Sequence, residues 1–263
     1  MKKANSNKRK SLFYLVLFAV CLCFFNTACG LDTINVVLDD PCYPSHTPDV
    51  DFQFDESYFE FTVRKLNNAN DFGQTTVYYK IYNDKSKALS ETSSLISASE
   101  DSVRKLTSVT TMTDQFGYKE LHYLDSSANG KLKSFNLPNE EHKVWIRLTN
   151  YDDTSKDYSA GIIVYDKQKV KHEYGIPVRR NGKTFDFGRT GENDENPSVN
   201  ISDANSTDSD TKGFLEKQAE DEENIFYVVM FTAFQMFNDS YEPVNSPVHH
   251  LGLVKINANE EKN

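Results

Sequence analysis

The sequence is poor in the residues that build covalent or metal-held frameworks. It has four cysteines and one tryptophan among 263 residues, and no two cysteines have CxxC spacing. The HExxH and GxSxG signatures are also absent, which excludes the common zinc-metalloprotease and α/β-hydrolase motifs. We therefore expect no catalytic site, no cofactor and no metal. With 39 acids, a chance pair of carboxylates does not by itself indicate a glycosidase.

Acidic residues outnumber basic residues: the sequence has 39 Asp and Glu but only 29 Lys and Arg. Residues 1–28 hold five of the basic residues and no acid. Their removal would change the net charge from −10 to −15 and leave 235 residues. Nucleic acids and anionic lipid headgroups bind basic patches, so this balance argues against both as partners. Solubility alone is sufficient to explain it.

The N-terminus has the pattern of a signal peptide. A basic block from Lys2 to Lys10 precedes an apolar run from Leu12 to Phe25. That run is shorter than the roughly 20 residues a membrane-spanning helix needs. We predict that residues 1–28 are a signal peptide, with an uncleaved anchor as an alternative.

The sequence Thr27-Ala28-Cys29-Gly30 resembles a bacterial lipobox. Asn26 stands where a leucine is usual, as in the looser lipoboxes of spirochaetes. The resemblance implies that Cys29 carries the lipid (diacylglycerol and a palmitate-type acyl chain) and becomes the first mature residue. A plain secretory signal with an incidental cysteine is the other interpretation. We expect a lipid-anchored protein of the cell membrane or outer membrane, on either face.

Residues 29–50 are predicted to be a lipidated, proline-rich tether, since Pro41, Pro44 and Pro48 favour extended backbone. His46 lies within it and has no nearby partner for a metal. Cys21 and Cys23 leave with the signal peptide, so Cys42 has no intramolecular partner and no disulfide framework is expected.

Residues 51–257 alternate apolar and polar side chains in the manner of half-buried strands. We predict an all-β domain, an antiparallel β-sandwich of immunoglobulin or fibronectin type with about seven to nine strands. Residues 225–237 are apolar on both faces and indicate a central strand. The predicted strands lie at residues 57–63, 75–82, 118–124, 142–149, 158–165, 225–237 and 250–256.

One segment has helical spacing. Leu89, Ile96 and Val103 recur every seven residues within 88–106, which predicts a short helical insertion crossing an end of the sandwich. Serines compete for backbone hydrogen bonds, so a Ser-rich loop is the alternative.

Residues 191–224 contain eleven acids and few large apolar side chains, which predicts an acidic disordered loop within the domain. Calcium binding is the alternative, although the regular ligand spacing of a calcium loop is lacking. Asn181-Gly182 indicates a tight turn rather than a phosphate-binding loop. His249 and His250 are adjacent in a strand and point to opposite faces, so a shared metal is not expected.

The segments "CGLDT" at 29–33 and "SPVHHLGLVKI" at 246–256 resemble uncharacterised treponemal lipoproteins. The resemblance covers both ends of the mature chain and implies no particular activity.

Together these features predict a membrane-anchored cell-envelope lipoprotein that acts as a binding or structural module for a protein or glycan. The alternatives are an exported enzyme acting on envelope glycan and an assembly component of an envelope complex. In the assembly alternative, exposed aromatic faces of edge strands would dock the partner through Tyr58, Tyr78, Tyr82 and Trp145, with core packing as the other interpretation of these side chains.

Overall fold

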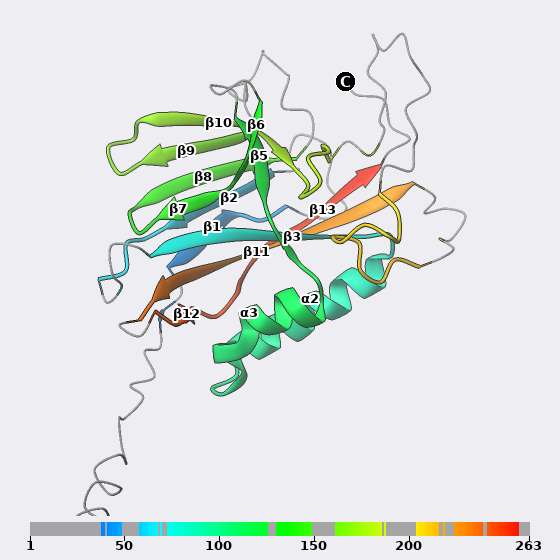
Figure 1. Ribbon diagram of the computed structural model, residues 1–263, viewed down its shortest axis with the longest axis horizontal. Coiled ribbons are helices and arrows are strands. Elements are labelled where there is room, and N and C mark those ends of the chain that lie inside the picture. Colours follow the sequence, from blue (N-terminus) through cyan, green and yellow to red (C-terminus); the bar gives the residue numbers. More distant parts are fainter. Residues whose placement is uncertain are drawn as a thin grey trace, which may run out of the picture. The chain divides into compact units, whose positions relative to one another are not determined.

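Two antiparallel sheets contain the strands of the computed structural model (Figure 1). The structure describes residues 38–39, 41–48, 58–67, 69, 73–125, 130–148, 161–185, 187, 204–215, 218, 224–238 and 241–257. The seven-stranded sheet has the order β1 (Cys42–His46), β2 (Tyr58–Val63), β8 (His142–Arg147), β9 (Ile162–Asp166), β10 (Lys171–Val178), β5 (His122–Asp125) and β6 (Lys131–Ser134). The six-stranded sheet has the order β12 (Pro243–Asn245), β11 (Ile225–Phe237), β3 (Gln74–Tyr82) and β4 (Lys119–Glu120), with β13 (His249–Asn257) paired to β11 and β7 (Asn136–Pro138) paired to β3. The predicted all-β sandwich architecture is therefore confirmed at the level of two open antiparallel sheets.

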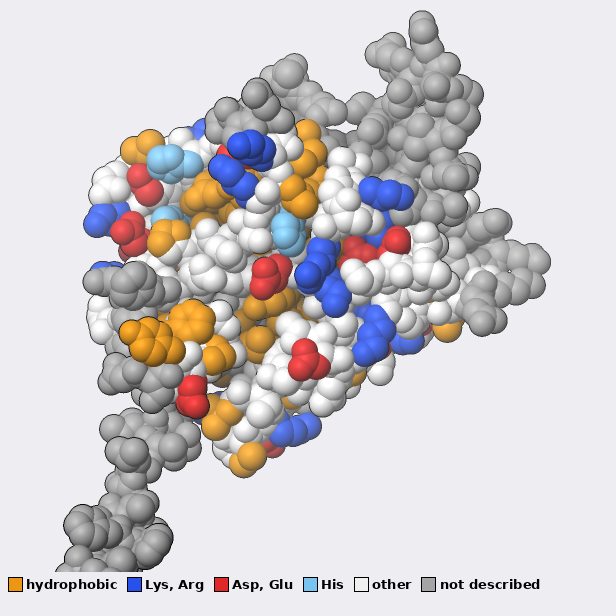
Figure 2. Space-filling model, in the orientation of Figure 1, with side chains coloured by type: hydrophobic (Ala, Val, Ile, Leu, Met, Phe, Trp, Pro, Cys, Tyr) orange, Lys and Arg blue, Asp and Glu red, His pale blue; other side chains and the backbone are white. Residues whose placement is uncertain are grey.

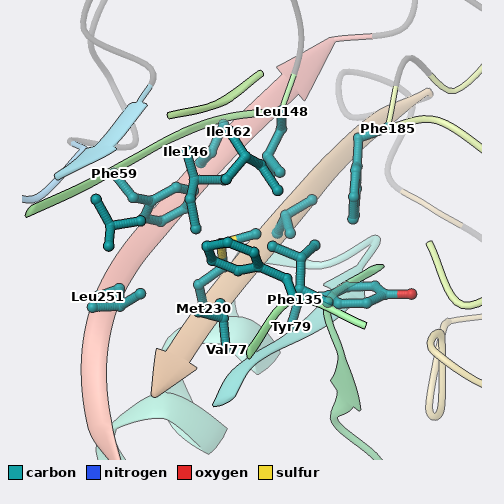
Figure 3. Close-up of a cluster of buried hydrophobic side chains, with 14 of the residues drawn as sticks. Phe59, Val77, Tyr79, Phe135, Ile146, Leu148, Ile162, Phe185, Met230 and Leu251 are labelled. Carbon is teal, nitrogen blue, oxygen red and sulfur yellow. The ribbon is translucent and has the colours of Figure 1, made fainter. Parts of the chain in front are cut away.

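Alternation along the strands places one row of side chains between the two sheets. Phe59 and Ile146 from the seven-stranded sheet meet Val77, Tyr79 and Met230 from the six-stranded sheet in this core (Figure 3). All five side chains have exposed fractions of 0%. In a half-buried strand such as β2, the apolar row seen in the sequence is thus the buried row.

Strand β11 is the central strand predicted from its two apolar faces. It pairs with β3 along one edge and with β13 and β12 along the other. Val228 and Met230 face the inter-sheet core, whereas Val229 and Phe231 face the opposite side. Both faces of β11 are buried because a helical layer covers that opposite side.

The helical layer consists of α2 (Lys85–Glu100), η2 (Arg104–Thr107), α3 (Ser108–Thr110) and η3 (Thr111–Gln115), so the predicted helical insertion is confirmed. Asp84 caps α2, its side chain accepting a hydrogen bond from the Lys87 amide at 2.6 Å. The prediction that the insertion crosses an end of the sandwich is wrong, because α2 and α3 lie against the outer face of the six-stranded sheet (Figure 1).

The helix face predicted from the sequence is wrong in part. Leu89 and Val103 are 46% and 74% exposed, whereas Ile96 packs against the buried cluster, and Ala88 and Leu95 are 0% exposed and face the sheet. Ala88 packs in the same cluster as Tyr78 and Tyr82 of β3, whose rings leave room for a small side chain beneath the helix.

The described residues form thirteen strands, more than the seven to nine predicted. One reason is that residues 119–125 and 131–138 each pass from one sheet to the other and so form two short strands apiece. At this corner the Phe135 amide donates to the carbonyl oxygen of Leu121 at 2.9 Å. A single alternating run in the sequence does not reveal such a change of sheet.

The folded part begins earlier than predicted, because β1 lies inside the segment assigned to the tether. Cys42 of β1 is 3% exposed and belongs to the inter-sheet core, and Leu38 is 1% exposed. Three polar or proline residues between Cys42 and His46 concealed this edge strand in the sequence.

Part of the predicted disordered loop is also folded. Residues 204–215, which we call the strap, form successive turns beside β3, and Ala204 joins the inter-sheet core. The backbone amide of Ile81 donates to the carbonyl oxygen of Asp210 at 3.0 Å, which covers the edge of β3 beyond β4. The remainder of 191–224, apart from residues 218 and 224, lies outside the described residues.

Candidate functional site

The structure brings together some of the residues predicted for a docking face and separates others. Tyr58 and Trp145 lie on the outer face of the seven-stranded sheet and are half-buried. Tyr78 and Tyr82 are 7% and 2% exposed, because α2 and α3 cover them. The prediction that these two form a docking surface is wrong. Cys29, the predicted lipidation site, lies outside the described residues.

Five aromatic side chains line the outer face of β1, β2, β8 and β9, and we call this surface the aromatic face: Tyr43, His46, Tyr58, Trp145 and Tyr165. Three of their rings form a stack. The His46 and Tyr58 ring centroids are 4.0 Å apart, and those of Tyr58 and Trp145 are 5.4 Å apart, with interplanar angles of 16° and 18°. Stacking fixes the ring orientations before any ligand arrives, so less entropy is lost on binding.

Sequence analysis identified two members of this stack and misassigned the third. His46 was placed in the tether, where it had no partner. In the structure it ends β1, and a register shift between Pro44 and His46 places it opposite Glu60. A β-bulge of this kind re-aims side chains at a sheet edge, and nothing in the local sequence indicates it.

Charged side chains flank the rings in neutralised pairs. Glu60 accepts a hydrogen bond from Ser45 at 2.6 Å and an ion pair from Lys143 at 2.9 Å. Lys143 also lies 5.5 Å from the Trp145 ring centroid, within cation–π range. Two arginines lie over rings of the same face, Arg147 at 5.6 Å from the Tyr58 ring centroid and Arg64 at 4.1 Å from that of Tyr43. The face therefore offers flat rings, an acceptor and a donor held in one ion pair, and two further cations.

A buried ion pair fastens the strap to the sandwich. Arg179, which is 0% exposed, donates to both carboxylate oxygens of Asp210 at 2.9 and 2.7 Å and to Asp208 at 2.6 Å. Tyr79 donates its hydroxyl proton to Asp210 at 2.7 Å and accepts from the Arg180 amide at 2.7 Å. These contacts give the strap carboxylates a guanidinium partner instead of the calcium ion considered from the sequence.

A second buried polar cluster lies between β3 and α2. Lys80, 1% exposed, forms an ion pair with Glu91 at 2.6 Å, and Tyr82 donates to the same carboxylate at 2.8 Å. Burial lowers the pKa of Lys80, and the bond to Glu91 opposes this effect. Sequence analysis missed the cluster, although a lysine within an otherwise buried strand was a signal. The geometry joins helix to sheet, which is a structural role.

One serine–histidine pair has the spacing of a nucleophile and its base. Ser134 Oγ lies 3.3 Å from His122 Nε2, while His122 Nδ1 lies 3.0 Å from the Glu120 carbonyl oxygen. The pair is exposed on β5 and β6, where water competes for every bond. Catalytic pairs depend on preorganised dipoles in a water-excluded site, so we interpret this as an ordinary cross-strand contact.

Other predicted features have structural positions. Asn181-Gly182 forms the predicted turn, with the Gly182 amide donating to the Arg179 carbonyl oxygen at 2.8 Å and a φ of 84° at Gly182. His250 lies beside Phe231, with ring centroids 5.0 Å apart and the ring planes tilted by 50°. Among the described residues, no three His, Cys, Asp or Glu side chains are grouped to hold a metal ion.

The described helices include none with the length and apolar character needed to cross a bilayer. Comparison with family models, curated proteins and solved structures gives no match to this chain. Function must therefore be argued from the geometry of the site.

Proposed function

We propose that this protein is a lipid-anchored module of a bacterial cell envelope that binds glycan through the aromatic face. The observation that carries the proposal is the His46–Tyr58–Trp145 stack on the outer side of a sheet. Aromatic side chains normally enter the core, where most of the phenylalanines among the described residues lie. A half-exposed stack of three rings marks a recognition surface.

The chemistry of the surface favours a sugar over an ionic ligand. Sugar rings present C–H groups to aromatic side chains, and their hydroxyls need both donors and acceptors at fixed positions. Glu60 and Lys143 supply one of each, held in place by their mutual ion pair. Because the pair carries no net charge, it attracts a neutral ligand without the desolvation cost of an unpaired ion.

The lipid anchor at Cys29 and the location in the cell membrane or outer membrane belong to the same proposal. They are supported by the lipobox-like sequence Thr27-Ala28-Cys29-Gly30. Two or more acyl chains hold a protein stably at a bilayer, at about 0.8 kcal/mol per buried methylene. Replacing Cys29 by Ala should move the protein from the detergent phase to the aqueous phase in a phase-separation assay. Retention in detergent would refute lipidation. The immunoglobulin or fibronectin type of connectivity likewise stays a prediction.

Trp145 makes the binding test direct, because it is the single tryptophan of the chain. Titration with soluble peptidoglycan fragments should change its fluorescence saturably. Tyr58→Ala removes the central ring of the stack and should weaken binding by about tenfold, equivalent to about 1.4 kcal/mol and within the range for an aromatic contact.

The matched control is Leu132→Ala, on edge strand β6 of the same sheet, where the side chain is 46% exposed. This variant should bind like the wild type. Equal affinity of wild type and Tyr58→Ala would refute the aromatic face as the binding site. Photo-crosslinking at position 145 that captures an envelope protein and no glycan would refute the ligand class.

A further inference from the structure

An exposed aromatic hairpin lies at one end of the six-stranded sheet, away from the aromatic face. Tyr241 is 87% exposed and Phe237 is 46% exposed, on either side of the turn that joins β11 to β12. Hydrophobic side chains gather over this end of the sheet (Figure 2). We call the two side chains Phe237 and Tyr241 the aromatic tip.

The backbone holds Tyr241 in place at an energetic cost. Its φ of 59° is in the left-handed region, which bulky residues avoid. The Tyr241 amide donates to the Asn238 carbonyl oxygen at 2.9 Å, and the Glu242 amide donates to Asn238 Oδ1 at 2.8 Å. Such backbone strain costs of the order of 1–3 kcal/mol and persists only where the surrounding structure enforces the strained conformation. The turn therefore presents a tyrosine to solvent in a fixed position.

The chain from Cys29 joins the sandwich at the same end. Pro41, just before β1, accepts a hydrogen bond from the Arg64 amide at 2.9 Å, and the Leu66 amide donates to Asn139 at 2.8 Å. From there, neighbouring strands are paired as far as the aromatic tip: β7 with β3 (Pro138–Gln74), β3 with β11 (Gln74–Gln235) and β11 with β12 (Phe237–Pro243). One continuous set of backbone pairings thus links the start of the folded part to the tip.

We propose that the aromatic tip rests in the headgroup layer of the bilayer to which Cys29 is attached. The inference depends on the proposed lipid anchor. Eleven residues separate Cys29 from Pro41, and the two Cα atoms can be at most about 40 Å apart, so this end of the sandwich stays near the membrane. Tyrosine suits the interface, since its ring is apolar and its hydroxyl stays hydrated. Glu242 is exposed beside it, which favours zwitterionic over anionic lipids.

The experiment uses the lipidated protein isolated from membranes and reconstituted into phosphatidylcholine vesicles that contain brominated acyl chains. Trp145→Phe removes the native fluorophore, and Tyr241→Trp places a new one at the tip. Bromine quenches tryptophan only at close range. We expect a loss of emission relative to unbrominated vesicles, and a smaller loss when part of the phosphatidylcholine is replaced by anionic lipid.

The control places the tryptophan at the other end of the sheet, as Trp145→Phe with Leu215→Trp. Leu215 is 44% exposed, and its amide donates to Asn83, just after the far end of β3, at 2.9 Å. Its emission should be unchanged by bromine. Vesicle flotation reports the anchor separately. Protein that floats without quenching at position 241 would overturn the tip contact alone, whereas protein that does not float would overturn the anchor and the tip contact together.

Discussion

The strap offers the sharpest test of the fold, because one buried guanidinium contacts two of its carboxylates. Arg179→Met removes the guanidinium and leaves Asp210, a 2% exposed residue, without its charge partner. Breaking a buried ion pair in this way costs about 3–5 kcal/mol. For a domain of this size that loss corresponds to a fall in melting temperature of roughly 6–20 °C.

Chemical denaturation and thermal melting measure the effect, and Arg180→Met is the matched control. Arg180 is the next residue along the chain, its side chain is exposed, and only its backbone amide contacts Tyr79. The control should change the free energy of unfolding by less than about 0.5 kcal/mol. A loss below about 1 kcal/mol in Arg179→Met would refute the claim that the strap is an integral part of the fold.

Limited trypsin digestion adds a local readout to the same comparison. Lys212, within the strap, donates to the Asp114 and Gln115 carbonyl oxygens at 3.2 and 2.7 Å. If Arg179 fastens the strap, cleavage after Lys212 should be faster in Arg179→Met than in Arg180→Met under conditions where both remain folded. Equal cleavage rates would contradict this role.

Leu95→Ala should lower the free energy of unfolding by about 2–4 kcal/mol, because Leu95 is fully buried on the sheet-facing side of α2. Leu89→Ala, on the exposed side, should lower it by less than about 0.5 kcal/mol. The reverse order in urea titrations would refute the assigned helix face. Burial lowers the pKa of His250 from 6.5 to about 4, so the unfolded state binds its proton more readily. Neutral His250 therefore contributes up to about 3 kcal/mol to the free energy of unfolding, a contribution that is complete above pH 6.5 and is lost as the pH falls through 4. A His250→Gln variant that loses the same stability over this pH range would disprove the assignment to His250. Glu91→Gln should cost about 2–4 kcal/mol by leaving Lys80 buried without a carboxylate, and a neutral result in thermal melting would show that water reaches the lysine.

The strands and the turn were predictable because their causes are local. Alternation within residues 58–63 follows from the geometry of a strand with one buried face, and Gly182 has the left-handed φ expected of its turn. The two apolar faces of residues 225–237 likewise indicated a central strand. These features depend on side chains a few positions apart.

The helix face and the strap were not predictable, because their causes are distant. The choice of Ala88 over Leu89 for the buried side depends on the bulk of Tyr78 and Tyr82 beneath the helix. The partner of Asp208 and Asp210 is 29 and 31 residues away, so an acidic composition was taken for disorder. Local hydrophobicity contains no information about which charge a carboxylate will meet.

The candidate site shows the same division. Tyr58 and Trp145 were identified because alternation places them opposite the apolar row of their strands, whereas the pairing of β2 with β8 that brings them together is a tertiary feature. His46 was missed, because a bulge at a sheet edge brought it into the stack. By itself the sequence determined the seven predicted strand segments and the apolar row of half-buried strands such as β2, since both depend on neighbouring residues. Only the tertiary structure decided which outward aromatics stay accessible, because that depends on whether a helix or another strand packs over them.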